Sequence, residues 1–378
     1  MSLSKEDAAE VSKMKELAAL FSIVVCTCSL TFPQTHATKS KLRQGAARTD
    51  ASNKSSSTVA LSLSSVVKDH RGGVWITGTA FLLAGLMVND RNGIVRPVVV
   101  PDVKIIRDPI FVTAEIGWMN GRQYLYRTID GGLSWQKRWI SGVSKIGTIH
   151  FGDSQNGWVG GSSGEIYRTT DGGQTWKRAE LPFKYEIKQI QFVDLLHGWA
   201  IGFSLISTQK TMRALFRSND GGETWQVMSN GDADEKGSVE SFFFLDEQNG
   251  WGIEGWQHNI IRTQDGGNTW TIQEVYPKNS WNLVFFQDDL HGWAIGHGIA
   301  HTSDGGATWN YQVDPETSHA YFEGITFIDE KHGWAVGSDK VLRTEDGGET
   351  WRPLPEDWKR LLPSFHSLNS QSKERRQR

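Results

Sequence analysis

The stretch RTTDGGQTW at residues 168–176 decides the fold, because the chain repeats its core, S/T-x-D-G-G-x-S/T-W, six times. We call this eight-residue pattern the box. The boxes are Thr128 to Trp135, Thr169 to Trp176, Ser218 to Trp225, Thr263 to Trp270, Thr302 to Trp309 and Thr344 to Trp351. Successive box aspartates lie 39 to 49 residues apart. A repeat of this length is typical of one four-stranded blade of a β-propeller.

A second repeated feature is a tryptophan that precedes each box at a nearly constant distance, in most units as Gly-Trp. These tryptophans are Trp75, Trp118, Trp158, Trp199, Trp251, Trp293 and Trp334. Trp75 has no box after it and marks an additional, earlier unit. We therefore predict an all-β fold, a seven-bladed β-propeller of four-stranded blades with box hairpins, spanning residues 58–356.

The box pattern suits a tight turn between the third and fourth strands of a blade. Two adjacent glycines supply positive φ angles, and the Asp and Ser/Thr side chains accept hydrogen bonds from backbone N–H groups that the turn leaves unpaired. Six equivalent carboxylates cannot converge on one substrate, so we assign them a structural role and predict no catalytic residue among them. They are Asp130, Asp171, Asp220, Asp265, Asp304 and Asp346.

Three histidines resemble a set of metal ligands, but they occupy one slot of a repeated D-x-x-H-G-W turn. They are His197, His291 and His332, and asparagine fills the same slot at Asn156 and Asn249. We interpret them as turn residues and predict neither a metal nor a cofactor.

The ends of the chain differ from the repeats. The apolar stretch LAALFSIVVCTCSLTF within residues 1–37 reads as a secretory signal peptide, with Met14 as an alternative start, and it contains both cysteines. Residues 38–57 read as a flexible linker, and residues 357–378 as a basic, disordered tail. We expect an exported protein without disulfides.

The charge of the chain argues against a nucleic-acid partner. It contains 40 Lys and Arg residues against 43 Asp and Glu, a formal net charge of -3 at pH 7. The excess of acid is larger once the basic tail is set aside, whereas nucleic-acid binding requires a basic surface.

The repeated unit G-W-x-x-G followed by I-x-R-T-x-D-G-G-x-T-W resembles the photosystem II stability/assembly factor family, and the box is the Asp-box of bacterial neuraminidase repeats. The resemblance covers residues 58–356. It implies a non-enzymatic propeller, located in the periplasm or, in a cyanobacterium, in the thylakoid lumen. It also implies capture of a membrane-protein client such as a photosystem II reaction-centre subunit, with only peripheral membrane contact. We expect a monomer.

An arginine immediately precedes five of the boxes, and His301 takes its place before another. We hypothesise that these arginines form a ring that captures acidic or carboxylate-bearing segments, joined by Arg122 and Arg213. The alternative is that each arginine bridges to the neighbouring blade or to a backbone carbonyl. The five ring arginines are Arg127, Arg168, Arg217, Arg262 and Arg343.

Insertions between strands supply a second set of candidates, because propellers commonly bind ligands through loops at blade edges. These candidates are Glu254, Trp256, His258 and His297. Trp256 could be a binding hot spot or could cap a blade edge.

The alternative function is a glycoside hydrolase, similar to a sialidase, on the same scaffold. Arg107-Asp108-Pro109 only approaches the arginine segment such an enzyme needs, and Tyr321 with Glu323 is the nearest approach to its Tyr-Glu pair. The other partners of that chemistry are missing from the sequence.

Overall fold

A computed structural model of the chain describes residues 61–68, 73–80, 86–89, 94–97, 107–181, 184–207, 210–232, 238–255, 257–275, 280–318, 320–337 and 340–354. The expected signal peptide (1–37), linker (38–57) and basic tail (357–378), together with Trp256, lie outside these residues. Within the described part of the chain, no helix has the length and apolar character that crossing a bilayer requires.

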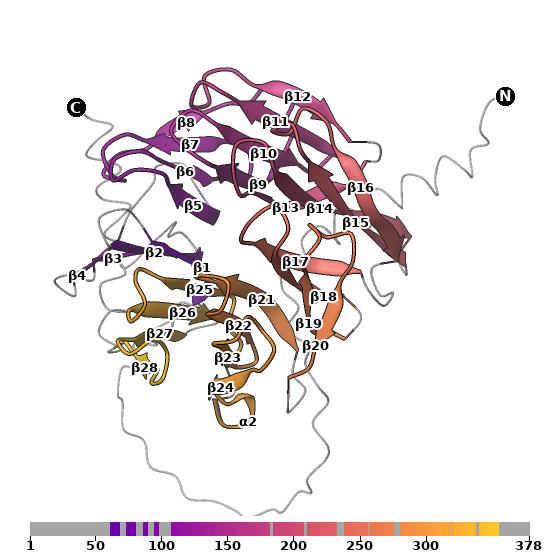
Figure 1. Cartoon of the computed structure of the whole chain (residues 1–378). Helices are drawn as coiled ribbons and strands as arrows, with labels where there is room; N and C mark the ends of the chain where they lie inside the picture. Colours follow the sequence, from indigo (N-terminus) through magenta and orange to yellow (C-terminus); the bar gives the residue numbers. More distant parts are fainter. Residues whose placement is uncertain are drawn as a thin grey trace, which may run out of the picture. The chain divides into compact units, whose positions relative to one another are not determined.

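The described strands form antiparallel four-stranded sheets, in each of which spatial order follows sequence order (Figure 1). Six of these sheets carry a box, and we number them box blades 1 to 6; the sheet before them is the first sheet. The first sheet contains β1 (Leu61–Lys68), β2 (Gly73–Ala80), β3 (Leu86–Asn89) and β4 (Ile94–Pro97).

The box blades follow one another along the chain. Box blade 1 contains β5 (Arg107–Phe111), β6 (Gly117–Asn120), β7 (Leu125–Thr128) and β8 (Gln136–Arg138). Box blade 2 contains β9 (Ile146–Phe151), β10 (Gly157–Gly161), β11 (Glu165–Thr169) and β12 (Lys177–Glu180). Box blade 3 contains β13 (Glu186–Phe192), β14 (Gly198–Ser207), β15 (Lys210–Ser218) and β16 (Gln226–Asp232).

The last three blades have the same plan. Box blade 4 contains β17 (Val239–Phe244), β18 (Gly250–Glu254), β19 (Ile260–Thr263) and β20 (Thr271–Gln273). Box blade 5 contains β21 (Trp281–Phe286), β22 (Gly292–Gly296), β23 (Ile299–Thr302) and β24 (Asn310–Val313), followed by the one-turn helix α2 (Pro315–Ser318). Box blade 6 contains β25 (Gly324–Phe327), β26 (Gly333–Gly337), β27 (Lys340–Thr344) and β28 (Arg352–Pro353).

Burial within a box blade changes from strand to strand. The second strand is buried along its whole length, as in β10 and β22, whereas outer strands such as β8 are exposed. A single sheet cannot bury both of its faces, so the apolar residues of the second and third strands are covered by the neighbouring blades. The core is therefore a series of apolar layers between blades.

Three aromatic rings pack together at each junction between neighbouring box blades. Trp158 stacks on Phe192 of the next blade with ring centroids 3.7 Å apart, and the box tryptophan Trp225 packs edge-on against Phe192 at 5.8 Å. The same arrangement recurs at the other four junctions between box blades. Both tryptophan series thus serve the packing between blades.

The first sheet closes the array. Strand β1 contacts β25 and β26 of box blade 6 on one side and β5 of box blade 1 on the other, and its label lies beside that of β25 in Figure 1. Val66 and Ile76 pack in one cluster with Trp334, while Trp75 packs on Phe111 at 5.0 Å.

These observations correct the predicted fold class. The chain is an all-β propeller with six four-stranded box blades, and not the seven-bladed propeller that was predicted. The prediction counted Trp75 as the mark of a seventh equivalent blade. Trp75 of the first sheet packs on the next blade as the other tryptophans do, but the sequence between β3 and β4 contains no box.

Candidate functional site

The box itself is a closed network of short hydrogen bonds. In box blade 3, the Ser218 hydroxyl donates to Asp220 Oδ1 at 2.8 Å and accepts from the Gly222 amide at 2.8 Å. The Thr224 amide and hydroxyl both donate to the Asp220 carboxylate, at 2.9 and 2.5 Å. Both glycines of every box have positive φ, between 70° and 92°. Six box carboxylates are thus occupied by their own turns.

The aspartates of the D-x-x-H-G-W turns are occupied in the same way. Asp194 accepts the backbone amides two and three residues later, and its Oδ2 contacts Nδ1 of His197 at 2.7 Å. His291 and His332 contact their own turn aspartates at 2.9 Å. The described residues contain no group of three potential metal ligands. Each of these histidines thus contacts the aspartate of its own turn.

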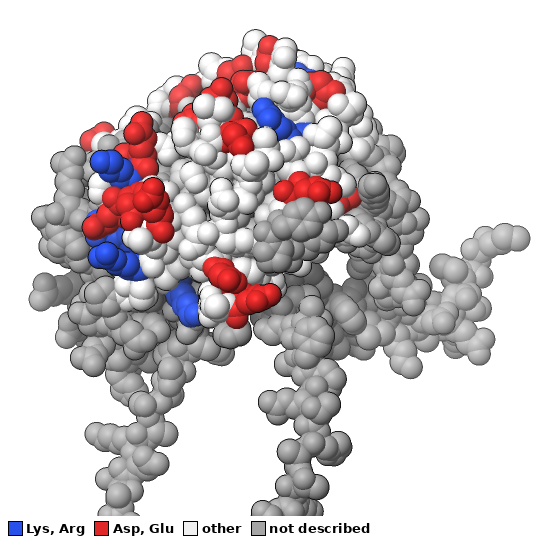
Figure 2. Space-filling model, turned by 60° about the horizontal axis from the view of Figure 1, so that its bottom comes forward, with Lys and Arg blue, Asp and Glu red and all other residues white. Residues whose placement is uncertain are grey.

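The loops at the box end of the blades are rich in acidic residues. The six box aspartates and the five turn aspartates all belong to connections at this end. On the face shown in Figure 2, Asp and Glu side chains are spread across the surface, with a few Lys and Arg side chains between them. The connections at the box end thus contain a carboxylate in every box and in five of the turns that precede the boxes.

The ring arginines lie between neighbouring blades, each beside the tryptophan of its own blade. The sheet register pairs Trp118 with Arg127 and Trp251 with Arg262, and their guanidinium carbons lie 5.5 and 5.3 Å from the indole centroids. Arg217 and Arg343 lie over Trp199 and Trp334 in the same way, at 5.4 and 5.5 Å. These distances are typical of cation–π contacts.

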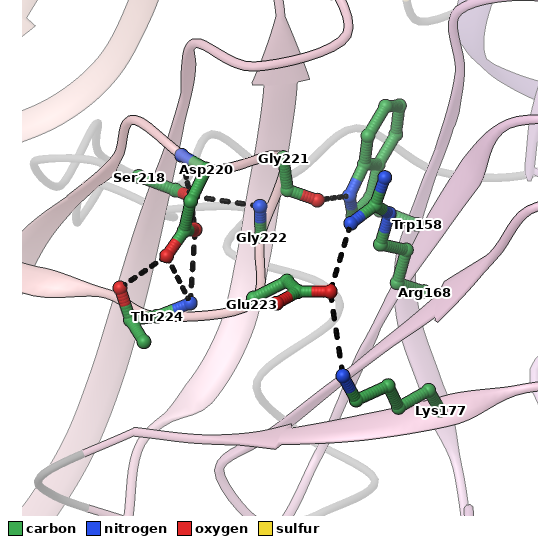
Figure 3. Close-up of polar contacts among 9 residues, drawn as sticks. All are labelled: Trp158, Arg168, Lys177, Ser218, Asp220, Gly221, Gly222, Glu223 and Thr224. Atoms are coloured by element: carbon green, nitrogen blue, oxygen red, sulfur yellow. Dashed lines mark hydrogen bonds and ion pairs between the residues drawn. The ribbon is translucent and has the colours of Figure 1, made fainter.

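The guanidinium groups then reach the box of the following blade. Those of Arg127, Arg168, Arg217 and Arg262 lie beside the first box glycine of that blade. At the junction drawn in Figure 3, Trp158 Nε1 donates to the Gly221 carbonyl at 2.8 Å, and Arg168 contacts Glu223 at 3.5 Å. This is the bridging contact that the sequence offered as the alternative.

The polar partners of these arginines differ from one another. Arg217 Nη2 donates to the Glu247 carbonyl at 3.2 Å, and Arg343 contacts Glu345 of its own blade at 3.0 Å. Among the described residues, Arg127, Arg217 and Arg262 make no ion pair with a carboxylate. Arg127 and Arg262 differ from Arg217 in that their guanidinium groups also make no hydrogen bond to another described residue.

Arg122 and Arg213 lie elsewhere. Arg122 has a φ of 67° in the hairpin between β6 and β7, and its backbone amide donates to Asn120 Oδ1 at 2.8 Å. Arg213 lies near the start of β15, over Phe203. Strands in a blade are antiparallel, so both arginines are at the ends opposite the boxes. The structure does not bring them together with the ring arginines.

The loop candidates gather at this opposite end. His258, which has a φ of 53°, contacts Glu240 through Nδ1 at 3.0 Å, and Arg213 contacts the same carboxylate at 3.2 Å. Glu254 is buried and accepts a hydrogen bond from Asn259 at 2.8 Å. Glu240 was not among the predicted residues, although a carboxylate within the first strand of a blade, β17, is an unusual feature of the sequence.

The residues of the hydrolase alternative also lie at this end. Burial raises the pKa of Tyr321, with further contributions from the nearby Glu323 and Glu240 carboxylates. Burial also raises the pKa of Glu323, against an opposing effect of Arg107. His297 meets the Tyr321 ring edge-on at 5.1 Å. A tyrosine with a raised pKa is less readily ionised at neutral pH, which opposes a role as nucleophile.

Comparison with known proteins shows the fold. Residues 123–238 match the Sortilin-Vps10 family, described as sortilin, neurotensin receptor 3, which is less than half of the chain. No curated protein sequence matches.

Among solved structures, the chain is similar to YCF48 bound to D1 peptide, with 21% identity and a TM-score of 0.55 over 67% of this chain and 82% of that one. YCF48 from Cyanidioschyzon merolae is 20% identical, with a TM-score of 0.59 over 76% of this chain and 96% of that one. An inactive virginiamycin B lyase from Staphylococcus aureus with quinupristin is 15% identical, with a TM-score of 0.55 over 76% of this chain and 96% of that one. The propeller fold is therefore shared with a protein solved with a peptide and with a lyase.

Proposed function

We propose that this chain is an exported, non-enzymatic scaffold that captures a client membrane protein during its assembly, as the photosystem II assembly factors do. The observation that carries the proposal is the pair of ring arginines, Arg127 and Arg262, whose guanidinium groups lie over indole rings and make neither an ion pair nor a hydrogen bond with another described residue. A preorganised guanidinium group of this kind suits a carboxylate-bearing segment of a protein.

Two further observations support binding over catalysis. A solved propeller of similar fold is YCF48 bound to D1 peptide, which makes a peptide-like client a reasonable class of ligand. The box and turn carboxylates are hydrogen-bonded within their own turns, which leaves them poor general acids or bases. The glycoside hydrolase is the less favoured alternative.

The test compares two charge-removing variants of the full chain. Arg127→Gln combined with Arg262→Gln should abolish client capture in a pull-down from the organism's membranes while lowering the melting temperature little. Arg168→Gln is the matched control, because this guanidinium contacts Glu223 across the junction and its loss should affect stability more than capture. Undiminished capture by the double variant would contradict the proposal.

An assay for hydrolysis separates the two functional classes. Incubation of the protein with a fluorogenic sialoside and a panel of polysaccharides should give no turnover. Turnover that disappears in Glu323→Gln would instead support the hydrolase.

A further inference from the structure

An aromatic pair lies at the outer edge of box blade 1, at the end of the blade opposite the box. Trp139 directly follows the outer strand β8 and is 60% exposed, and in the described part of the chain it is the one exposed tryptophan. Its ring centroid lies 5.5 Å from that of the half-buried Tyr124, with an angle of 57° between the rings. Strand β8 is separated from the inner strand β5 by two other strands (Figure 1).

The repeat has polar residues at these positions in the next blade. In box blade 1 the pairing of β7 with β8 ends at Leu125 and Arg138, and the aromatic pair lies one residue further on. The corresponding pair in box blade 2 is Glu165 and Glu180. The aromatic pair is therefore a feature of box blade 1 and not of the repeated packing between blades.

Basic side chains surround the aromatic pair. Lys137 and Arg138 are exposed on β8, and Nζ of Lys137 lies 3.5 Å from the centroid of the Tyr124 ring. Arg122 lies with Tyr124 in the hairpin between β6 and β7. Among the described residues, these three cations make no ion pair with a carboxylate. Their charges are thus available to an anionic partner.

The charge of this part of the chain is opposite to that of the whole. Residues 116–150 contain five Lys and Arg residues and one acidic residue, Asp130, whereas the complete chain has a formal net charge of -3. The Asp130 carboxylate accepts hydrogen bonds from Ser134 within its box, at the other end of the blade. The outer edge of box blade 1 is therefore both aromatic and basic.

This combination of side chains matches the surface of an anionic lipid bilayer. Tryptophan and tyrosine are the residues enriched at membrane–water interfaces, because each has an apolar ring with a polar tip. Lysine and arginine lay their aliphatic stems along the apolar region and keep their charges at the headgroups. An outer strand can approach a flat surface, whereas small ligands are bound in concave sites.

We propose that the outer edge of box blade 1 docks the propeller on an anionic lipid bilayer. The rings of Trp139 and Tyr124 enter the headgroup region. Lys137, Arg138 and Arg122 contact the lipid phosphates. This surface lies at the opposite end of the blade from Arg127, so it is separate from the ring arginines and needs no client protein.

The experiment mixes the full chain with vesicles whose lipids are brominated on their acyl chains, because bromine quenches tryptophan fluorescence only at close range. Residues 1–57 contain no tryptophan, so quenching reports on the propeller and not on the apolar segment near the N-terminus. We expect quenching by vesicles of phosphatidylglycerol and phosphatidylcholine in equal parts, and much less by phosphatidylcholine alone. High salt should reduce it, since salt screens exposed charges.

Charge-removing variants locate the contact. Lys137→Gln combined with Arg138→Gln should weaken binding to the anionic vesicles about tenfold or more, because each cation near an anionic surface adds to the attraction. Lys177→Gln combined with Arg178→Gln is the matched control, since it removes the same charge from β12, the outer strand of the next blade. This control should bind as the wild type does. All variants should keep the wild-type melting temperature, because the substituted residues are exposed.

A third variant, Trp139→Gln, should lose most of the quenching. Quenching that persists in this variant, or an equal loss of binding in the β8 and β12 variants, would overturn the proposal. So would an absence of quenching by anionic vesicles, and binding of an acidic polysaccharide in its place would then identify a soluble polyanion as the partner. The vesicles contain no protein, so these outcomes are independent of client capture by Arg127 and Arg262.

Discussion

The aspartate of each box stabilises its hairpin through hydrogen bonds to its carboxylate. Hydrogen bonds from the Thr308 hydroxyl and amide lower the pKa of Asp304 to about 2, and Asp130, Asp171 and Asp346 have pKa values of about 2 for the same reason. A folded-state pKa below the unfolded value of about 3.9 means that the ionised form stabilises the fold.

We therefore predict that the free energy of unfolding decreases at acidic pH. The contribution of the box carboxylates is complete above about pH 4 and is lost as the pH falls towards 2. Asp304→Asn should lower the free energy of unfolding at pH 7 by about 1–2 kcal/mol, at the lower end of the range for hydrogen bonds to a charged group because this carboxylate is exposed to solvent. Urea unfolding followed by tryptophan fluorescence measures this, and the exposed Glu349→Gln in a neighbouring box is the control. Equal stability of both variants would contradict the structural role of the carboxylate.

A second pH dependence belongs to His150, whose ring lies near Trp158 and Phe192. Burial lowers its pKa to about 4, against an opposing effect of the Phe192 backbone. The folded state thus favours the neutral ring, so stability is complete above about pH 6.5 and falls as the pH decreases from there to about 4, by at most about 1.4 kcal/mol per pH unit. His150→Gln should be less sensitive than the wild type when urea unfolding at pH 7 and pH 5 is compared. A wild type equally stable at both pH values would contradict this.

At the scale of the strand and hairpin, the bond between Trp199 and the next box fixes the spacing of two blades. Trp199 Nε1 donates to the Gly266 carbonyl at 2.9 Å, and its ring stacks on Phe244 at 3.7 Å. Trp199→Phe retains an aromatic ring but leaves this carbonyl without its donor, and should cost about 1–3 kcal/mol of unfolding free energy. Trp139→Phe changes an exposed ring and should alter stability by less than about 0.5 kcal/mol. Thermal unfolding of both variants checks the contrast.

How well the sequence predicts these contacts depends on how far apart the interacting residues are along the chain. The box and turn bonds join residues two to four positions apart, so the pattern of Asp, Gly and Ser/Thr specifies them locally. The tryptophan bonds between blades join residues 63, 67 and 54 positions apart, and no local pattern specifies their partners.

The candidate site shows the same limit. The repeated position of the arginines was evident from the sequence, but their placement between an indole ring and the next box depends on how blades pack. Arg122 and Arg213 were grouped with them by charge alone, and the direction of the strands separates them. The first sheet was counted as an equivalent blade because Trp75 performs the same packing without a box.

At the scale of the whole molecule, the first sheet protects two apolar surfaces at once. Val66 and Ile76 cover Trp334 of box blade 6, and Trp75 covers Phe111 of box blade 1. A chain that begins after residue 97 should expose both surfaces and associate, because large exposed apolar patches promote association. Sedimentation velocity should show oligomers or aggregates for this chain, whereas a chain ending at Leu354 should sediment as the full chain does. A shortened chain without residues 61–97 that sediments as a single folded species would contradict this role.

The bonds between blades also give the array a direction. At each junction where the indole bond forms, the donor belongs to the earlier blade and the acceptor to the later one. During synthesis, every completed blade therefore presents an uncovered tryptophan until its successor emerges. The first sheet waits longest, since its partner strands β25 and β26 belong to the last blade to be made. A chaperone that recognises exposed aromatic rings would meet this protein continually from the first sheet onwards, and would be released only when the C-terminal blade arrives.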